Sequence, residues 1–194
     1  MSDAVIASGV VAVAVFGFAP QNGAMLTAGA ARTFKPVLDG MVASLCGWLL
    51  VFGLSLGILH LLPPWANSAG MILASLYLAL AGLTRYLADP GAIRQARQPA
   101  SGSQASPLPM HQLQSPESWA VAVFLAGSAL SGSVTLAAAF VGLILLTTFG
   151  LSLWAAAGWS GCEYLTSGWH RRHLDWAFGI LMFVAAMASL TPGA

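Results

Sequence analysis

The amino-acid sequence predicts an all-α integral membrane protein with six transmembrane helices, arranged as two inverted three-helix repeats. Of its 194 residues, 58% are hydrophobic and 7% are charged, and the mean hydropathy is +0.80. A soluble domain carries about 25% charged residues, so this composition excludes a soluble fold, and it excludes disorder as well. The formal net charge of +1 gives no support to nucleic-acid binding.

Six segments of the chain are apolar and long enough to cross a membrane, which takes about 20 mostly apolar residues. None alternates apolar and polar residues as barrel strands do. Their separators include a charged turn closed by Pro36, the pair Pro63-Pro64, a Gly- and Pro-rich loop and the polar turn 131–133. The first segment lacks the positive start of a signal peptide and is too long for one. The segments are residues 4–31, 37–62, 66–87, 108–130, 134–160 and 174–190.

These segments form one predicted membrane domain over residues 1–194, oriented by its basic residues. All seven basic side chains fall in, or within three residues of, the loops after the first, third and fifth segments: Arg32, Lys35, Arg85, Arg94, Arg97, Arg171 and Arg172. The positive-inside rule places those loops in the cytoplasm and both termini outside. The first repeat is then residues 4–87, the cytoplasmic linker 88–107 and the second repeat 108–190.

Two paired features, each about half the chain apart, predict the repeat. The pentapeptide Phe-Gly-Leu-Ser-Leu at 52–56 recurs at 149–153, and Pro20-Gln21-Asn22 matches Pro116-Glu117-Ser118. Because each half holds an odd number of spans, the second copy must be inverted in the bilayer. We assign the glycines and serines of the pentapeptide to close helix packing.

The two prolines are expected to break the first and fourth helices near the middle of the membrane. At about 1.5 Å per residue, Pro20 and Pro116 lie about 16 and 12 Å from the cytoplasmic ends of their segments. Proline removes a helix hydrogen bond, and polar neighbours would be costly in lipid. Paired broken helices in inverted halves point to a transporter's substrate site, and free helix N-terminal amides favour an anionic group. The alternative is a pair of simple kinks patched by side chains.

The candidate site consists of the prolines and their neighbours. Glu117, inside the fourth segment, would bind a cationic amine or carry a proton if it faces a cavity, and the alternative is a cap for the following half-helix. Asp39 is the second candidate for charge or proton coupling, although it also suits an interfacial helix start. The substrate-binding candidates are Pro20, Gln21, Asn22, Gln112, Ser115, Pro116, Glu117 and Trp119.

No metal or cofactor site is expected. His170 and His173 flank two arginines, and this group suits an interfacial anchor better than a metal site. Cys46 and Cys162 form no Cys-x-x-Cys pair and occupy different places in the two halves, which argues against a disulfide or redox role.

The chain resembles the lysine/homoserine exporter (LysE/RhtB-type) family of bacterial amino-acid efflux proteins, as a divergent member. The resemblance is carried by residues 18–22, 40–57, 77–82, 149–154 and 171–179. It implies a six-span exporter in the bacterial inner membrane that is coupled to the proton gradient. Where the family has Pro-Gly-Pro-Asn and Asn-Pro-Lys-x-Trp, this chain has Ala-Pro-Gln-Asn and Ser-Pro-Glu-Ser-Trp. Glu117 in place of lysine favours a cation, or a ligand without a carboxylate.

The leading hypothesis is therefore a secondary transporter, not an enzyme, that exports amino acids or related small polar metabolites by alternating access. The alternatives are a non-transporting membrane scaffold or regulator, a membrane-embedded redox enzyme or protease, and a metal-ion exporter. Paired cysteines, a Ser/His dyad and an acidic or His-rich loop, which the enzyme and metal alternatives need, are not visible. Expected partners are the transported metabolite, the lipid bilayer and a second copy in a homodimer.

Overall fold

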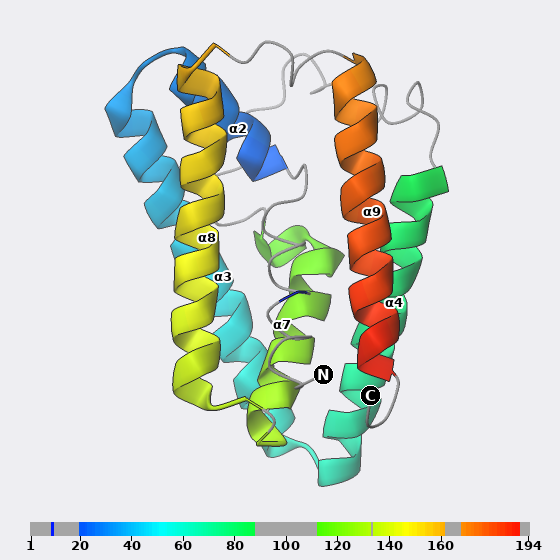
Figure 1. The fold of residues 1–194 in the computed structure, drawn as a ribbon. Helices are drawn as coiled ribbons and strands as arrows, with labels where there is room; N and C mark the ends of the chain where they lie inside the picture. The colour runs from blue at the N-terminus through cyan, green and yellow to red at the C-terminus, as the bar shows by residue number, and fades with distance from the viewer. Residues whose placement is uncertain (1–8, 10–19, 88–111, 133, 162–167, 191–194) are drawn as a thin grey trace.

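The computed structural model describes residues 9, 20–87, 112–132, 134–161 and 168–190. This part of the chain is all-helical, in agreement with the predicted fold class, and its helices stand side by side as a bundle (Figure 1). The predictions for residues 4–8, 10–19, 88–111 and 162–167 lie outside it. The helices are α2 (Pro20–Ala30), α3 (Phe34–Leu61), α4 (Pro64–Leu87), α7 (Pro116–Leu130), α8 (Leu136–Trp159) and α9 (Gly168–Leu190).

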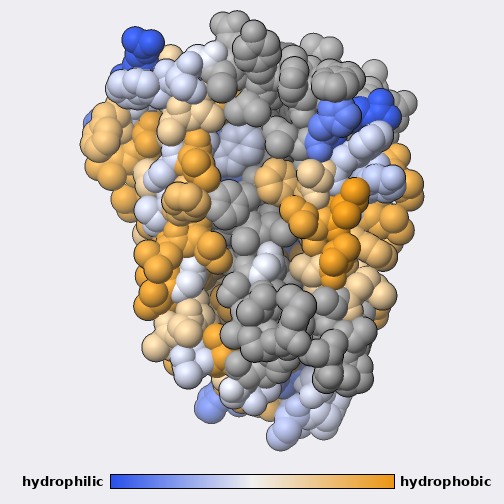
Figure 2. Space-filling view, viewed as in Figure 1, coloured by the Kyte–Doolittle hydropathy of each residue, from blue (hydrophilic) through white to orange (hydrophobic). Residues whose placement is uncertain are grey.

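Three helices in the described part are long and apolar enough to cross a membrane: Phe34–Leu61, Pro64–Thr84 and Leu136–Trp159. Shorter apolar helices cover Pro116–Leu130 and Trp176–Met187. Many large hydrophobic side chains of α3, α4, α8 and α9 are exposed, and Figure 2 shows hydrophobic residues along both sides of the face in view, with hydrophilic residues gathered at its two ends. A soluble protein does not expose such a continuous apolar surface, so these features are those of a membrane protein.

A proline starts helix α7 at Pro116, where its fixed φ and missing N–H suit the first helical position. Pro20 is the first described residue of α2, so the predicted break there lies at the edge of the described part. Residues 112–114 are helical and Ser115 is not, so the fourth apolar segment is interrupted before Pro116 as expected. α9, by contrast, begins at Gly168, six residues before the predicted start of the sixth segment.

Glycines allow α2 and α8 to approach each other at backbone distance. A Cβ atom at Gly29 would overlap the carbonyl oxygen of Ala155, and one at Gly158 would overlap the carbonyl oxygen of Leu26. The contact is reciprocal, because each helix presents a glycine to a carbonyl of the other. Dispersion contacts between closely packed backbones are the main attraction between helices in lipid.

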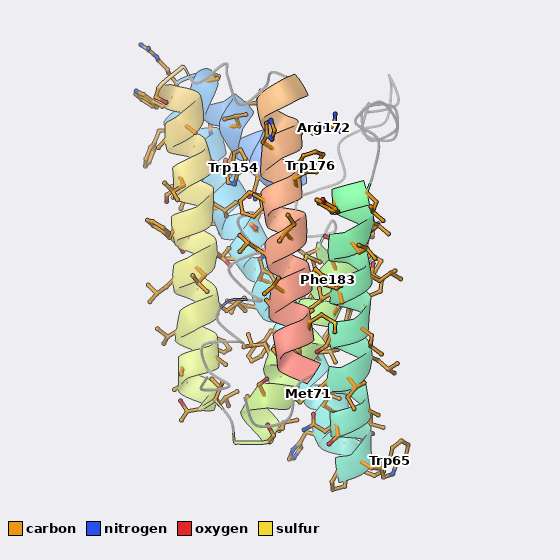
Figure 3. The ribbon with its side chains drawn as sticks, turned by 45° about the vertical axis from the view of Figure 1, so that its right-hand side comes forward. Trp65, Met71, Trp154, Arg172, Trp176 and Phe183 are labelled. Atoms are coloured by element: carbon orange, nitrogen blue, oxygen red, sulfur yellow. The ribbon has the colours of Figure 1, made fainter. Side chains whose placement is uncertain are left out.

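Helices α4 and α9 also pack through a glycine and are joined at one end by aromatic side chains. A Cβ atom at Gly82 would lie 2.6 Å from the carbonyl oxygen of Gly179. Near the start of α9 the ring of Trp176 lies 5.7 Å from that of Tyr86, and the Arg172 guanidinium carbon lies 4.7 Å from the Trp176 ring centroid. Figure 3 places these two α9 residues at the end opposite Trp65.

The repeated pentapeptide does not occupy equivalent places in α3 and α8. Phe52 and Ser55 are buried in α3, whereas their counterparts Phe149 and Ser152 are exposed in α8. Gly53 is exposed as well, and nothing lies within 4 Å of a Cβ atom added there. The predicted packing role is therefore wrong for Gly53 and Ser152, because these residues face away from the neighbouring helices.

We predict that Gly158→Ala destabilises the protein by about 1–3 kcal/mol, the usual cost of overpacking, because the new methyl group would meet the α2 backbone. Gly142→Ala, in the same helix, is the matched control, since nothing lies within 4 Å of a Cβ atom there. Thermal unfolding of the purified protein in detergent measures both. Equal unfolding midpoints for the two variants would contradict the α2–α8 contact.

Candidate functional site

Buried polar side chains lie between two hydrophobic clusters of the bundle. One cluster, which we call the α2–α8 cluster, contains Met25, Leu26, Leu151 and Trp154. The other, the central cluster, contains Trp48, Phe52, Val121 and Leu143 among others. The buried residues between them form what we call the polar layer: Gln21, Asn22, Ser44, Gln112, Ser118 and Thr147.

The order of residues along α3 and α8 locates this layer. On α3, Ser44 lies between Met41, which packs against the α2–α8 cluster, and Trp48 of the central cluster. On α8, Thr147 lies between Leu143 of the central cluster and Leu151 of the α2–α8 cluster. The two helices run in opposite directions (Figure 1), so both orders place the polar residue at the same junction.

Hydrogen bonds join four members of the layer. The Gln21 Oε1 atom accepts hydrogen bonds from the Ser44 hydroxyl at 2.9 Å and from the Gln112 side-chain amide. The Gln112 Oε1 atom accepts from the Ser118 hydroxyl at 2.6 Å. These bonds connect α2, α3, the 112–114 turn and α7, and they link residues 91 positions apart in the chain. In a low-dielectric interior, paired polar groups of this kind hold their elements in one arrangement.

Nearby side chains form hydrogen bonds with backbone groups at the interruption before Pro116. The indole N–H of Trp119 donates to the Leu113 carbonyl oxygen at 2.8 Å, which replaces a bond that a continuous helix would provide. Ser115 is the N-cap of α7, and its hydroxyl accepts from the Ser118 amide at 3.4 Å. The break therefore leaves its backbone groups paired, as a buried or membrane-embedded break requires.

Glu117 lies in the first turn of α7 and is half-buried. The capping residue is Ser115, so the prediction that Glu117 itself caps this helix is wrong. A carboxylate in the first turn still interacts favourably with the positive end of the helix dipole. The structure thus keeps an acid directly beside Ser118 of the polar layer.

The predicted site residues separate into two groups. Gln21, Asn22 and Gln112 lie in the polar layer, and Ser115, Pro116, Glu117 and Trp119 lie at the adjoining start of α7, as Pro20 does at the start of α2. Asp39 is exposed on α3 and lies five residues, or about 7.5 Å of helix, before Ser44. The structure does not bring Asp39 into the layer.

Three layer residues were missed in the sequence: Ser44, Ser118 and Thr147. Their signal is a hydroxyl within an apolar segment, which is common in membrane helices and does not reveal which face it occupies. Among the described residues no three His, Cys, Asp or Glu side chains are grouped to hold a metal ion. Cys46 is exposed on α3, and Cys162 lies outside the described part.

We predict that Gln112→Leu destabilises the protein by about 1–3 kcal/mol, the cost of leaving one buried polar group without a hydrogen bond, because the Ser118 hydroxyl would lose its acceptor while Gln21 keeps its bond from Ser44. The exposed residue Gln114 provides the control, and Gln114→Leu should leave stability nearly unchanged. Thermal unfolding in detergent again measures the difference. If both variants unfold at the wild-type temperature, the network does not stabilise the bundle.

Comparison of the chain with models of known protein families, with curated proteins and with solved structures finds no match to any of them. The likeness to the exporter family stays a prediction carried by its motifs.

Proposed function

We propose that this protein is a secondary transporter that exports amino acids or related small polar metabolites across the bacterial inner membrane. The observation that carries the proposal is the polar layer. It lies within a bundle of apolar helices, and it is built beside the starts of two short helices from opposite halves of the chain. Interrupted helices that meet at mid-membrane commonly form substrate sites in transporters.

The pairing of the helices supports an inverted repeat of three helices per half. Helix α2 packs on α8, and α7 packs on α3, so each short helix contacts the long helix of the other half. If α2 corresponds to α7, α3 to α8 and α4 to α9, exchanging the halves turns the α2–α8 pair into the α7–α3 pair. The same exchange leaves the α4–α9 pair unchanged. The α4–α7 contact has no matching α2–α9 contact of similar extent among the described residues, so a two-fold axis relates these three pairs but not every helix contact.

The burial of α3 and α8 supports the same repeat, in a different register from the pentapeptide. Residues of α3 and α8 that are 99 positions apart share their burial, whereas the identical pentapeptides are 97 apart. The matching buried positions are Gly40, Ser44, Trp48, Val51, Phe52, Ser55 and Leu59 in α3 and Ala139, Leu143, Thr147, Gly150, Leu151, Trp154 and Gly158 in α8.

The chemistry of the layer suits a small polar molecule. Its amides and hydroxyls donate and accept hydrogen bonds without carrying charge, and Glu117 beside it would bind a substrate amine or carry a proton. Alternating access would rock one half against the other, so the hydrogen bond between Gln21 and Gln112 would break and re-form in each cycle. A network of neutral groups is suited to such exchange because no buried charge is left unpaired.

The orientation follows the basic residues. Arg32, in the turn between α2 and α3, Lys35, in the first turn of α3, and Arg172, near the start of α9, lie at one end of the bundle (Figures 1 and 3). The positive-inside rule makes this end cytoplasmic, with both termini on the periplasmic side.

The substrate is best identified by comparing metabolites in cells with and without the protein. A transporter should lower the cytoplasmic level of its substrate, and the same compound should enter inside-out vesicles that contain the protein. A scaffold or regulator would change metabolite levels without any uptake into vesicles.

We predict that Glu117→Gln lowers proton-driven uptake into inside-out vesicles about tenfold or more, whereas Glu117→Asp keeps much of it, because removal of one positioned acid–base group typically costs a factor of 10² or more. Uptake is measured with and without a protonophore. Wild-type uptake by Glu117→Gln would exclude a charge or proton role for this residue.

The topology has its own test in a chain that carries Cys46→Ser and Cys162→Ser. We predict that Ser131→Cys is labelled in intact cells by a membrane-impermeant maleimide, after the outer membrane is made permeable, and that Thr33→Cys is labelled only after lysis. Both residues are exposed and lie in connections at opposite ends of the bundle. The reverse labelling would invert the orientation, and unchanged function of the cysteine-free chain would exclude the redox alternative.

A further inference from the structure

Two buried polar atoms near the polar layer have no hydrogen-bond partner. They are the hydroxyl oxygen of Thr147, whose side chain is 0% exposed, and the indole nitrogen of Trp48, which is 2% exposed. Buried polar atoms in native proteins are nearly always hydrogen-bonded to protein or to a bound molecule. A threonine in a helix commonly bonds the carbonyl one turn earlier, and Thr147 does not.

Thr147 and Trp48 lie at similar levels along the antiparallel helices α3 and α8. The ring centroids of Phe52 and Phe140 are 5.9 Å apart, so these residues are opposite each other on antiparallel helices. Thr147 lies seven residues after Phe140, which is about 10.5 Å along α8. Because α3 runs in the opposite direction, the same distance from Phe52 leads back toward the start of α3, past Trp48, to a position next to Ser44. Thr147 and Trp48 therefore lie within about one helical turn of each other along the bundle axis.

Their position separates them from the other unpartnered buried atoms. Ser55 also has a buried hydroxyl without a partner, but it lies two turns beyond Trp48, well inside the central cluster. Trp48 and Thr147 instead lie next to the hydrogen-bonded network. Its member Ser44 lies one helical turn from Trp48 and donates a hydrogen bond to Gln21.

We propose that Thr147 and Trp48 bind the transported molecule through an uncharged oxygen, such as an amide or ester carbonyl. The indole N–H can only donate, and the threonine hydroxyl can donate as well, so together they fit an acceptor. Among the described members of the polar layer no side chain is cationic, so nothing there would balance a carboxylate. This inference rests on the proposed function, and it narrows the substrate to amines that carry an uncharged carbonyl.

The test uses L-serinamide as the probe and L-serine as its charged counterpart, with the purified full chain in detergent. L-serinamide should raise the thermal unfolding midpoint of the wild-type chain more than L-serine does. Thr147→Val should weaken the apparent affinity for L-serinamide about tenfold, the effect of one lost hydrogen bond, while Thr147→Ser restores it. Thr148→Val, at the adjacent half-buried residue, is the matched control and should bind as the wild type does.

Stability without the probe separates binding from a structural role. Because the Thr147 hydroxyl has no partner in the protein, Thr147→Val should unfold at or above the wild-type temperature when no probe is present. A clear loss of stability would show that the hydroxyl is structural and would overturn the inference. Trp48→Phe, which keeps an aromatic ring and loses only the N–H donor, gives a second and independent variant and should also weaken L-serinamide binding.

Three further experimental results would contradict the inference but would leave the proposed transport function untested. Equal affinity of Thr147→Val and wild type, stronger stabilisation by L-serine, or no stabilisation of the wild type by L-serinamide would each overturn it. The metabolite comparison and vesicle uptake use neither this probe nor these variants, so they test export independently. Failure of those assays would reject the transporter itself.

Discussion

A buried polar group in an apolar bundle must find a hydrogen-bond partner, and this constraint organises the middle of the molecule. Pro116 cannot continue the helix before it, so the backbone around Ser115 needs other partners. Trp119 and Ser115 supply them from the first turn of α7. Gln112, held in the turn just before the break, then reaches Gln21 of α2. The helix break before Pro116 and the polar layer are therefore connected by the same set of hydrogen bonds.

Outside the layer the bundle depends on close backbone packing. Lipid is as apolar as the helix surfaces, so burying leucine gains little there and short distances between backbones matter more. The glycines Gly29, Gly82 and Gly158 provide those distances at the α2–α8 and α4–α9 contacts. Trp176 adds an aromatic and cation–π contact at the basic end, between α9 and Tyr86 of α4.

The layer has two properties that the proposed transporter would require together. It holds the two halves of the chain in contact through neutral hydrogen bonds, which can be exchanged for bonds to a polar molecule at low cost. It also leaves donors of Thr147 and Trp48 unused at its edge. A fully satisfied network would have no such capacity, and a fully apolar core would have no means to recognise a polar ligand.

Composition and the positions of prolines alone predict a helical chain suited to a membrane, a helix start at Pro116, and Gln21, Asn22 and Gln112 as candidate site residues, which the structure buries in one layer. Hydropathy and proline act locally, so a single segment carries their signal. Tertiary structure decided which face of each helix is buried. The two copies of the pentapeptide differ in burial, and Asp39 lies outside the polar layer. The N-cap of α7 is Ser115 and not Glu117. The layer also contains Ser44, Ser118 and Thr147. A helix that is apolar on all sides does not encode its own rotation, because only contact with its neighbours distinguishes one face from another.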